Sequence, residues 1–271
     1  MTRTIACLSF LVPVILRAAA PVPAEVIPER IPGAKPRNVV FILSDDHRYD
    51  AMSFLHHPFA KTPVMDSLAA NGAYIKNALV TTSLCSPSRA SILTGLYTFR
   101  HRVIDNNRPI PPGTVYFPQY LQKTGYATCF IGKWHMPGKL PDLRGVDTFI
   151  TFTAEEGQGQ YVDCPLLING EMVDRPGTYI TEDLTDLALE WINNRPPGKP
   201  YALWLAHKAV HHRFIPPENR RGALADADLS NLPPEAFAFL SLMDENIWEG
   251  TLGNLQTLYR KAWPRDANTA P

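Results

Sequence analysis

Three continuous apolar runs, each bounded by polar or turn-forming residues, dominate the hydrophobic pattern of the chain. They cover residues 38–43, 126–131 and 201–206. Runs of this length without alternating polar positions are typical of strands that are buried on both faces, as in a parallel sheet. We therefore predict three buried strands.

Helical signals lie between these runs. Predicted helices begin at Thr62-Pro63 and end at Asn71-Gly72, extend from Phe117 to Lys123, and begin at a Thr181 cap and end before Pro196. The weaker patterns predict a strand over 73–80, loop and short strands over 141–180, and a loosely patterned helix over 234–263.

This alternation of strands and helices predicts an α/β fold with a mostly parallel sheet flanked by helices. Polar residues follow each of the three strands, namely Asp45 and Asp46, Lys133 and His135, and His207 and His211. Ligands bind at the carboxyl ends of strands in open α/β sheets. We therefore predict an active site at this edge.

The N-terminus has the pattern of a signal peptide over residues 1–24. Arg3 supplies the positive start, and an apolar stretch leads to Ala18-Ala19-Ala20, a small-residue cleavage site. Because the apolar stretch is short and Arg17 interrupts it, we predict no transmembrane span and a secreted or periplasmic protein. The alternative is an uncleaved N-terminal anchor. Residues 25–36 are a Pro-rich linker.

Charge and cysteine content narrow the picture further. The net charge is zero, which gives no indication of a nucleic-acid partner. The chain has four cysteines, of which Cys7 would leave with the signal peptide. Cys129 and Cys164 either pair in an oxidising compartment or stay two free buried thiols.

Cys85 lies in the stretch that carries the most specific chemistry. Ser86 suits a helix N-cap, Pro87 the first helical position and Gly95 the residue that ends the helix. Cys85 would then precede the positive end of a helix dipole, where an anion or a thiolate is stabilised.

The run Cys85-Ser86-Pro87-Ser88-Arg89, followed by Leu93-Thr94-Gly95, resembles the signature of the type I, formylglycine-dependent sulfatases of the alkaline phosphatase superfamily. The resemblance implies that a formylglycine-generating or sulfatase-maturating enzyme oxidises Cys85 to formylglycine. The alternative is a structural cysteine before an ordinary helix.

The resemblance also implies a metal site. Asp45 and Asp46 match the paired carboxylates that bind a divalent cation, usually Ca²⁺, together with the Cys85-derived hydroxyl. Hard cations of this kind take oxygen ligands. The alternative is that these carboxylates cap the turn after the strand.

Cationic residues complete the implied site. Gly132-Lys133-Trp134-His135 matches a family segment in which Lys133 binds the sulfate oxygens and His135 hydrogen-bonds the formylglycine hydroxyl. Arg89 follows Cys85 by one helical turn, and its guanidinium suits an oxyanion. The alternatives are that Lys133 and Arg89 are surface residues and that His135 is a solvated or core histidine.

His207 and His211 resemble a His-x-x-x-His segment whose second histidine contacts the substrate near the leaving group. His211 is therefore the better candidate to protonate the departing alkoxide, and both histidines are predicted to bind substrate. His212 is an alternative, whereas His101 and the other histidines receive no role.

Residues 37–220 resemble the N-terminal catalytic region of a sulfatase. The family continues with an Asp-Asn or Asp-His pair and a further lysine, and the only nearby cluster is Asp244-Glu245-Asn246 in a helical pattern. We therefore expect a C-terminally truncated domain in which 221–271 is a helical segment of uncertain role, and water or a partner completes the metal shell.

The implied function is a sulfuric ester hydrolase that cleaves sulfate monoesters. Residues 101–107 resemble carbohydrate sulfatases, which favours sulfated glycans as substrates. The first alternative is a non-catalytic protein that binds sulfated glycans or is inactive. The second is a related phosphoesterase, but such enzymes place Ser or Thr where Cys85 stands.

Overall fold

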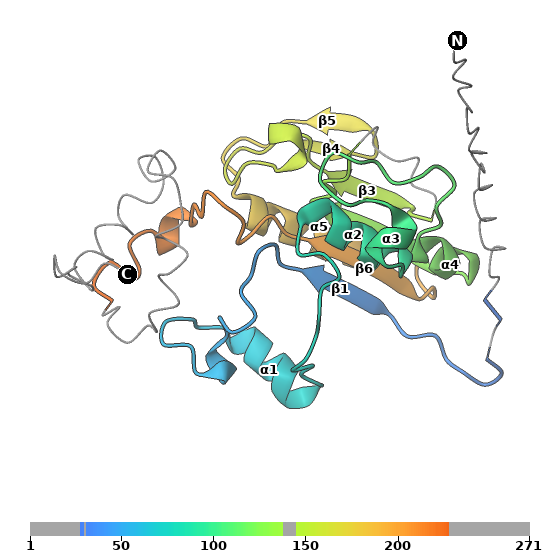
Figure 1. Cartoon of the computed structure of the whole chain (residues 1–271), viewed down its shortest axis with the longest axis horizontal. Coiled ribbons are helices and arrows are strands. Elements are labelled where there is room, and N and C mark those ends of the chain that lie inside the picture. The colour runs from blue at the N-terminus through green and yellow to red at the C-terminus, as the bar shows by residue number, and fades with distance from the viewer. Residues whose placement is uncertain (1–27, 30, 138–144, 228–271) are drawn as a thin grey trace, which may run out of the picture.

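The computed structural model describes residues 28–29, 31–137 and 145–227. They fold around a six-stranded sheet with the strand order β1-β6-β2-β3-β4-β5 (Figure 1). The strands are β1 (Val39–Leu43), β2 (Ala127–Gly132), β3 (Thr148–Thr151), β4 (Leu166–Ile168), β5 (Glu171–Val173) and β6 (Tyr201–Ala206). β1, β6, β2 and β3 are parallel, whereas β4 and β5 are added antiparallel. The mostly parallel α/β fold and its three predicted strands are confirmed.

Five α-helices and three short 3₁₀ helices are described. They are η1 (Ser53–Leu55), α1 (Pro63–Asn71), α2 (Cys85–Thr94), α3 (Thr98–His101), α4 (Phe117–Lys123), η2 (Glu155–Gly157), α5 (Ile180–Asn194) and η3 (Glu218–Arg220). α1 and η1 lie to one side of the sheet, beyond β1 (Figure 1). The predicted loop with short strands over 141–180 holds for its described part.

Two predicted helix starts are wrong by a residue or more. α2 begins at Cys85, and its N-cap is Leu84 rather than Ser86. The Ser86 hydroxyl does not cap the helix because it donates to the carbonyl oxygen of His135 (2.8 Å). α5 begins at Ile180 after Tyr179, and Thr181 lies inside its first turn.

The predicted strand over 73–80 is also wrong. This segment is an exposed irregular stretch in which the Leu79 side chain is 92% exposed. A strand needs a neighbour that pairs with its backbone N–H and C=O groups. The segment pairs with no described strand, so its apolar composition alone does not make it extended. The predicted helix over 234–263 lies outside the described residues, as do residues 1–27 and Asp244-Glu245-Asn246.

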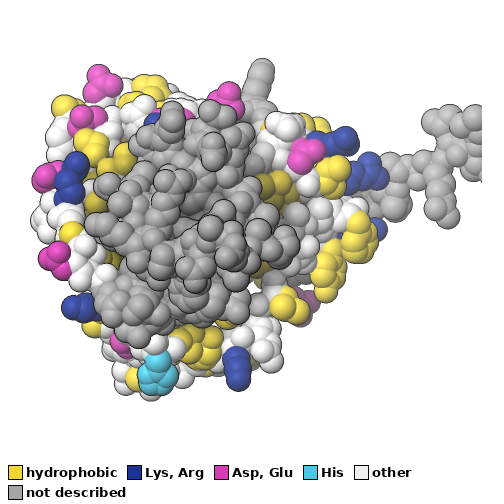
Figure 2. Space-filling model, turned by 60° about the vertical axis from the view of Figure 1, so that its left-hand side comes forward, with side chains coloured by type: hydrophobic (Ala, Val, Ile, Leu, Met, Phe, Trp, Pro, Cys, Tyr) yellow, Lys and Arg dark blue, Asp and Glu magenta, His cyan; other side chains and the backbone are white. Residues whose placement is uncertain are grey.

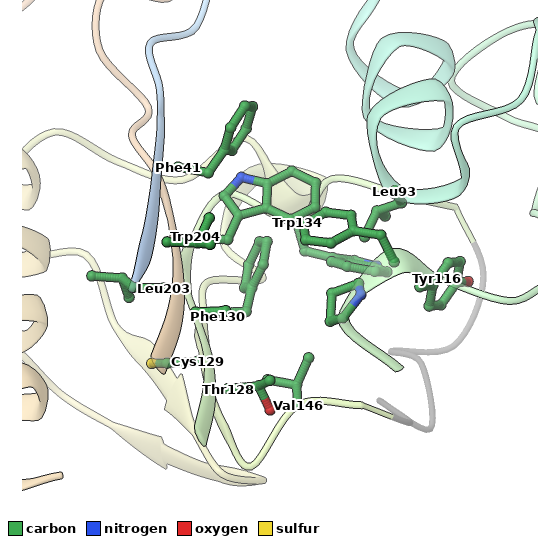
Figure 3. Close-up of a pocket in the computed structure, with 14 residues that line it drawn as sticks. Phe41, Leu93, Tyr116, Thr128, Cys129, Phe130, Trp134, Val146, Leu203 and Trp204 are labelled. Carbon is green, nitrogen blue, oxygen red and sulfur yellow. The ribbon is translucent and has the colours of Figure 1, made fainter. Parts of the chain in front are cut away.

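The sheet is covered on both faces, as the uninterrupted apolar runs require. Alternate strand residues such as Ile131 and Leu205 pack with Leu184 of α5 on one face. Their neighbours Phe130 and Trp204 pack with Leu93 of α2 on the other face. Figure 3 shows this second cluster, in which Phe41, Phe130 and Trp204 surround an apolar cavity of about 20 Å³, about the size of one water molecule.

Gly132 turns the chain at the end of β2 and so sets the position of the residues that follow. Its φ is +114°, and a Cβ there would lie 1.9 Å from the carbonyl oxygen of Ala206. Only glycine fits such a close approach of two strands. The next residue, Lys133, donates its backbone N–H to the same carbonyl oxygen (2.8 Å).

The described surface carries mixed charges. In Figure 2, basic and acidic side chains are interspersed around the visible described rim. Within the described ranges, no helix is long and apolar enough to cross a membrane.

Candidate active site

A cavity of about 460 Å³ opens at the carboxyl ends of β1 and β6, next to the first turn of α2. Parallel pairing aligns these strand ends, because Ala206 of β6 is in register with both Leu43 of β1 and Gly132 of β2. The predicted residues Asp45, Asp46, Cys85, Arg89 and His211 line the cavity, together with Leu43, Ser44, His47, Val80, Ser83, Leu84, Ser88, Asn106 and Gln158.

Asp45 is the buried anion of the site, and two cations contact it. The Lys133 Nζ lies 2.5 Å from Asp45 Oδ2, and the Arg89 Nη2 lies 3.5 Å from the same oxygen. Burial alone raises the pKa of the Asp45 carboxyl, but the charges of Arg89 and Lys133 outweigh it, and the net effect lowers the pKa. Asp45 is therefore ionised at neutral pH.

The two cations are fully enclosed by the protein. Lys133 is 0% exposed and Arg89 is 3% exposed. An Nη1–H of Arg89 donates to the carbonyl oxygen of Lys133, while the Arg89 Nε has no partner among the described residues. One carboxylate thus faces two buried cations, so this cluster has an excess of positive charge. The unpaired Arg89 Nε–H adds a buried hydrogen-bond donor without an acceptor. Such a site favours an additional anion.

Cys85 is the first residue of α2 and is partly exposed in the cavity. Its Sγ lies 3.8 Å from the Lys133 Nζ. Burial raises the pKa of the Cys85 thiol, and the nearby charges of Lys133 and Arg89 do not reverse this effect. Desolvation thus acts against the expected thiolate at Cys85 and outweighs the attraction of the two cations.

His135 lies beside the cations and is held by its backbone. Its carbonyl oxygen accepts a hydrogen bond from the Ser86 hydroxyl, and its Nε2 lies 3.1 Å from the Gln158 Nε2. Burial, and then the charges of Lys133 and Arg89, lower the pKa of His135 to about 4. His135 is therefore a neutral imidazole at physiological pH.

His211 and Asp46 form the outer part of the site. The His211 Nε2 lies 3.6 Å from Asp46 Oδ2, and the Asp46 side chain is 57% exposed. The loop that carries His211 is fixed against β1, because the Val210 N–H donates to the carbonyl oxygen of Asp45 (2.7 Å). Burial lowers the pKa of His211.

Three of the predicted residues, Lys133, His135 and His207, are not among those that line the cavity. Lys133 and His135 still contact its lining, because Lys133 bonds Asp45 and both bond Gln158. The His207 N–H donates to the carbonyl oxygen of Leu43 and so extends the β1–β6 pairing. The His207 Nδ1 is buried without a partner in the described residues. Proximity in sequence to His211 did not bring His207 to the cavity. The alternative His212 packs its ring against Phe214 instead.

The donors of the cavity fit part of a calcium shell. Asp45, Cys85 and His211 each offer an atom, and these atoms lie within 4.8 Å of one another. Asp46 adds a second carboxylate to the lining. Ca²⁺ takes about six to eight oxygen ligands, so the two carboxylates and an oxygen in place of the Cys85 sulfur suit it chemically but supply only part of the shell.

Sequence reasoning missed three residues of this region. Gln158 contacts both Lys133 and His135. Asn106 accepts a hydrogen bond from the Ser86 N–H at the start of α2 (3.0 Å). Lys208 is 2% exposed and lies over the Tyr161 ring. Gln158 lies in a segment predicted only as loop, and flanking glycines were its sole signal. The cysteines Cys129 and Cys164 are free and buried, which is the second of the two alternatives.

The Sulfatase family model matches residues 37–238. N-acetylglucosamine-6-O-sulfatase of Bacteroides thetaiotaomicron is 32% identical over 185 residues, which are 68% of this chain and 32% of that protein. Mouse arylsulfatase J is 30% identical over 248 residues, covering 81% of this chain and 40% of that protein. The chain thus spans about a third to two fifths of the length of these curated relatives.

A solved structure extends the similarity to the fold. It is described as a complex with its substrate, D-glucosamine-2-N,6-O-disulfate. Its superposition has a TM-score of 0.68 and 31% sequence identity, and it covers 72% of this chain and 38% of that one. The shared part includes the alkaline-phosphatase-like arrangement of a mostly parallel sheet between helices.

Proposed function

The chain belongs to the sulfatase family, and on that premise we propose that it is a sulfuric ester hydrolase that cleaves sulfate monoesters. The observation that carries the proposal is the excess of buried positive charge beside Cys85. Asp45 contacts both Lys133 and Arg89, so this buried cluster at the cavity wall has one more cation than anion. A sulfate group has the charge and the acceptor oxygens that this arrangement lacks.

Each predicted residue then has a physical task. Lys133 and Arg89 bind the sulfuryl oxygens and offset the charge that develops on them as the ester bond breaks. Neutral His135 orients the attacking group through a hydrogen bond. His211 lies at the more open side, near Asp46, and it protonates the departing alcohol oxygen.

Two groups that the family implies would act here. A formylglycine made from Cys85 would supply a hydrated aldehyde as the nucleophile, which suits a site where burial raises the pKa of the thiol itself. Asp45, Asp46 and the Cys85-derived oxygen would hold a Ca²⁺ ion, which would supply positive charge next to the sulfate.

We further propose that the substrate is a sulfated carbohydrate. The comparisons support this class by the printed descriptions, an N-acetylglucosamine-6-O-sulfatase in one and a structure solved with a disulfated glucosamine in the other. Maturation requires a formylglycine-generating or sulfatase-maturating enzyme, and the N-terminal pattern over 1–24 would direct the chain to a secreted or periplasmic location.

The test is sulfate release from glucosamine 6-sulfate and an aryl sulfate by the full chain, co-expressed with a maturation enzyme. We expect release by the wild type and none by Cys85→Ala. Cys164→Ala, which removes a buried thiol away from the cavity, should keep release. Mass analysis of the peptide with Cys85 must show the aldehyde. Aldehyde-bearing protein that releases no sulfate would overturn the proposal.

One observation favours a second candidate, a protein that binds sulfated glycans without turnover. Within the described residues the calcium donors are fewer than a full shell requires. Binding of a sulfated sugar that is unchanged in Cys85→Ala, without release by the aldehyde form, would support this alternative.

A further inference from the structure

Gln158 is the described residue whose side chain joins two of the predicted catalytic groups. Its Oε1 lies 2.7 Å from the Lys133 Nζ, and its Nε2 lies 3.1 Å from the His135 Nε2. It comes from the loop after β3, far in sequence from both partners, and it lines the cavity. Neither the motif of α2 nor the segment after β2 contains it.

The orientation of the Gln158 amide follows from the chemistry of its neighbours. An ammonium group has only donors, so the oxygen of the amide must face the Lys133 Nζ. The amide nitrogen then faces His135. An amide nitrogen only donates, so the His135 Nε2 must accept and cannot carry a proton. The opposite orientation would set the donors of the amide nitrogen against the donors of the Lys133 ammonium.

The backbone around Gln158 holds this side chain in place. The Lys208 Nζ donates to the Gln158 carbonyl oxygen (3.1 Å), and the Gln158 N–H donates to the carbonyl oxygen of Glu155 (3.0 Å). Gly159 follows with a φ of +73°, and a Cβ there would lie 2.5 Å from the Phe152 ring. The chain is therefore fixed on both sides of Gln158.

We propose that Gln158 is a positioning residue that anchors the Lys133 ammonium and fixes neutral His135 in the tautomer that carries its proton on Nδ1. The proton then sits on a nitrogen that is buried and has no partner among the described residues. A buried N–H of this kind calls for an acceptor. Under the proposed function, on which this part rests, that acceptor is an oxygen of the matured site or the sulfate ester.

The test of the tautomer needs no activity. The ¹⁵N shifts of the histidine rings distinguish the two tautomers by two-bond ¹H–¹⁵N correlation, and His135→Asn assigns the signals of His135 among the eight histidines. We expect the Nδ1–H form in the wild type. Gln158→Leu removes the donor, so the preference for this form should be lost.

Gln158→Glu gives the sharper result. A carboxylate still accepts from Lys133 but also presents an acceptor to the His135 Nε2, so the proton should move to Nε2. A merely structural role for Gln158 would not invert the tautomer. Gln160→Leu, the same change at an exposed position in the same loop, should leave the spectrum unchanged.

Two outcomes would overturn the proposal. One is an Nε2–H form of His135 in the wild type, and the other is an unchanged Nδ1–H preference in both Gln158 variants. In matured enzyme, Gln158→Leu should lower kcat by about tenfold with a smaller change in KM. If the wild type releases no sulfate, the proposed function fails while the tautomer result still stands.

Discussion

Two buried carboxylates in this molecule have opposite arrangements of charge around them. Asp183 of α5 is 3% exposed at its side chain, and among the described residues its one ion-pair partner is Arg175, which donates from Nε to Oδ2 (2.9 Å) and from Nη2 to Oδ1. Asp45, with a side chain 10% exposed, faces Arg89 and Lys133 together. The charges at Asp183 are balanced, whereas the site at Asp45 has one cation in excess.

The balance of charge separates a structural pair from a candidate binding site. In the Asp183 pair both carboxylate oxygens and two guanidinium nitrogens are used, and the pair ties the segment before α5 to the helix. At Asp45 both cations contact the same oxygen, Oδ2, and the Arg89 Nε has no described partner. Burial alone would not have distinguished these two sites.

Removing the charge of Asp45 should have the largest effect. Asp45→Asn leaves Lys133 and Arg89 buried without a carboxylate, and we expect the free energy of unfolding to fall by about 4 kcal/mol and sulfate release to be lost. Urea unfolding and sulfate release measure the two effects. Asp46→Asn, at the exposed neighbour, should change stability by less than about 0.5 kcal/mol. Equal stability losses in both variants would contradict the comparison.

Removing one cation of the site should affect activity more than stability. In Arg89→Met, Lys133 still neutralises Asp45, so we expect sulfate release to fall about 100-fold while the free energy of unfolding changes by less than about 1 kcal/mol. Arg100→Met, at an exposed position in α3, is the control and should retain release. A large stability loss with unchanged release would assign Arg89 a structural role.

Removing the charge of Asp183, in the balanced pair, should affect stability more than activity. Asp183→Asn removes the charge that Arg175 contacts, and we expect about 2 kcal/mol of lost stability. Sulfate release by the folded fraction should be unchanged, because Asp183 lies on α5 and neither residue of the pair lines the cavity. Thermal unfolding followed by an assay well below the midpoint tests this. Lost release in fully folded protein would refute the separation of the two sites.

The buried histidine His101 should make the stability of the protein depend on pH. His101 is 1% exposed; its Nδ1 accepts the Val103 N–H, and its Nε2 is hydrogen-bonded to Ser91. Burial lowers the pKa of His101 below its usual 6.5. The unfolded chain therefore binds protons more readily, and stability present above pH 6.5 is lost as the pH falls through the folded-state pKa.

His101→Gln should consequently lose less stability than the wild type between pH 7 and pH 5, as urea unfolding at each pH would measure. His56→Gln, an exposed histidine, should keep the pH dependence of the wild type. A His101→Gln variant with the full wild-type dependence would show that other groups cause it.

The smallest effect is expected at an exposed ion pair. The Arg48 Nε lies 2.6 Å from Asp50 Oδ1, about as close as Lys133 lies to Asp45, but the side chains are 50% and 35% exposed. Water screens such a pair, so Arg48→Ala should change the free energy of unfolding by no more than about 0.5 kcal/mol. A loss comparable with that of Asp183→Asn would show that distance, not solvent exposure, sets these energies.

The sequence by itself determined the three buried strands and the residues that follow them. Uninterrupted apolar runs require burial on both faces, and parallel pairing brings the ends of such strands to one edge, so Asp45, Lys133 and His211 were predictable as neighbours. The short run from Cys85 to Arg89 identified the family because its chemistry is local in sequence.

Only the tertiary structure decided how these groups act. The pKa of Cys85 depends on desolvation by distant segments, and the start of α2 depends on the bonds that Ser86 makes to another loop. The His207 N–H extends the strand pairing, and its side chain does not line the cavity. Gln158 was brought to the cavity from a loop without a recognisable motif. Charge balance and hydrogen bonding are sums over neighbours in space, and local sequence patterns do not contain those neighbours.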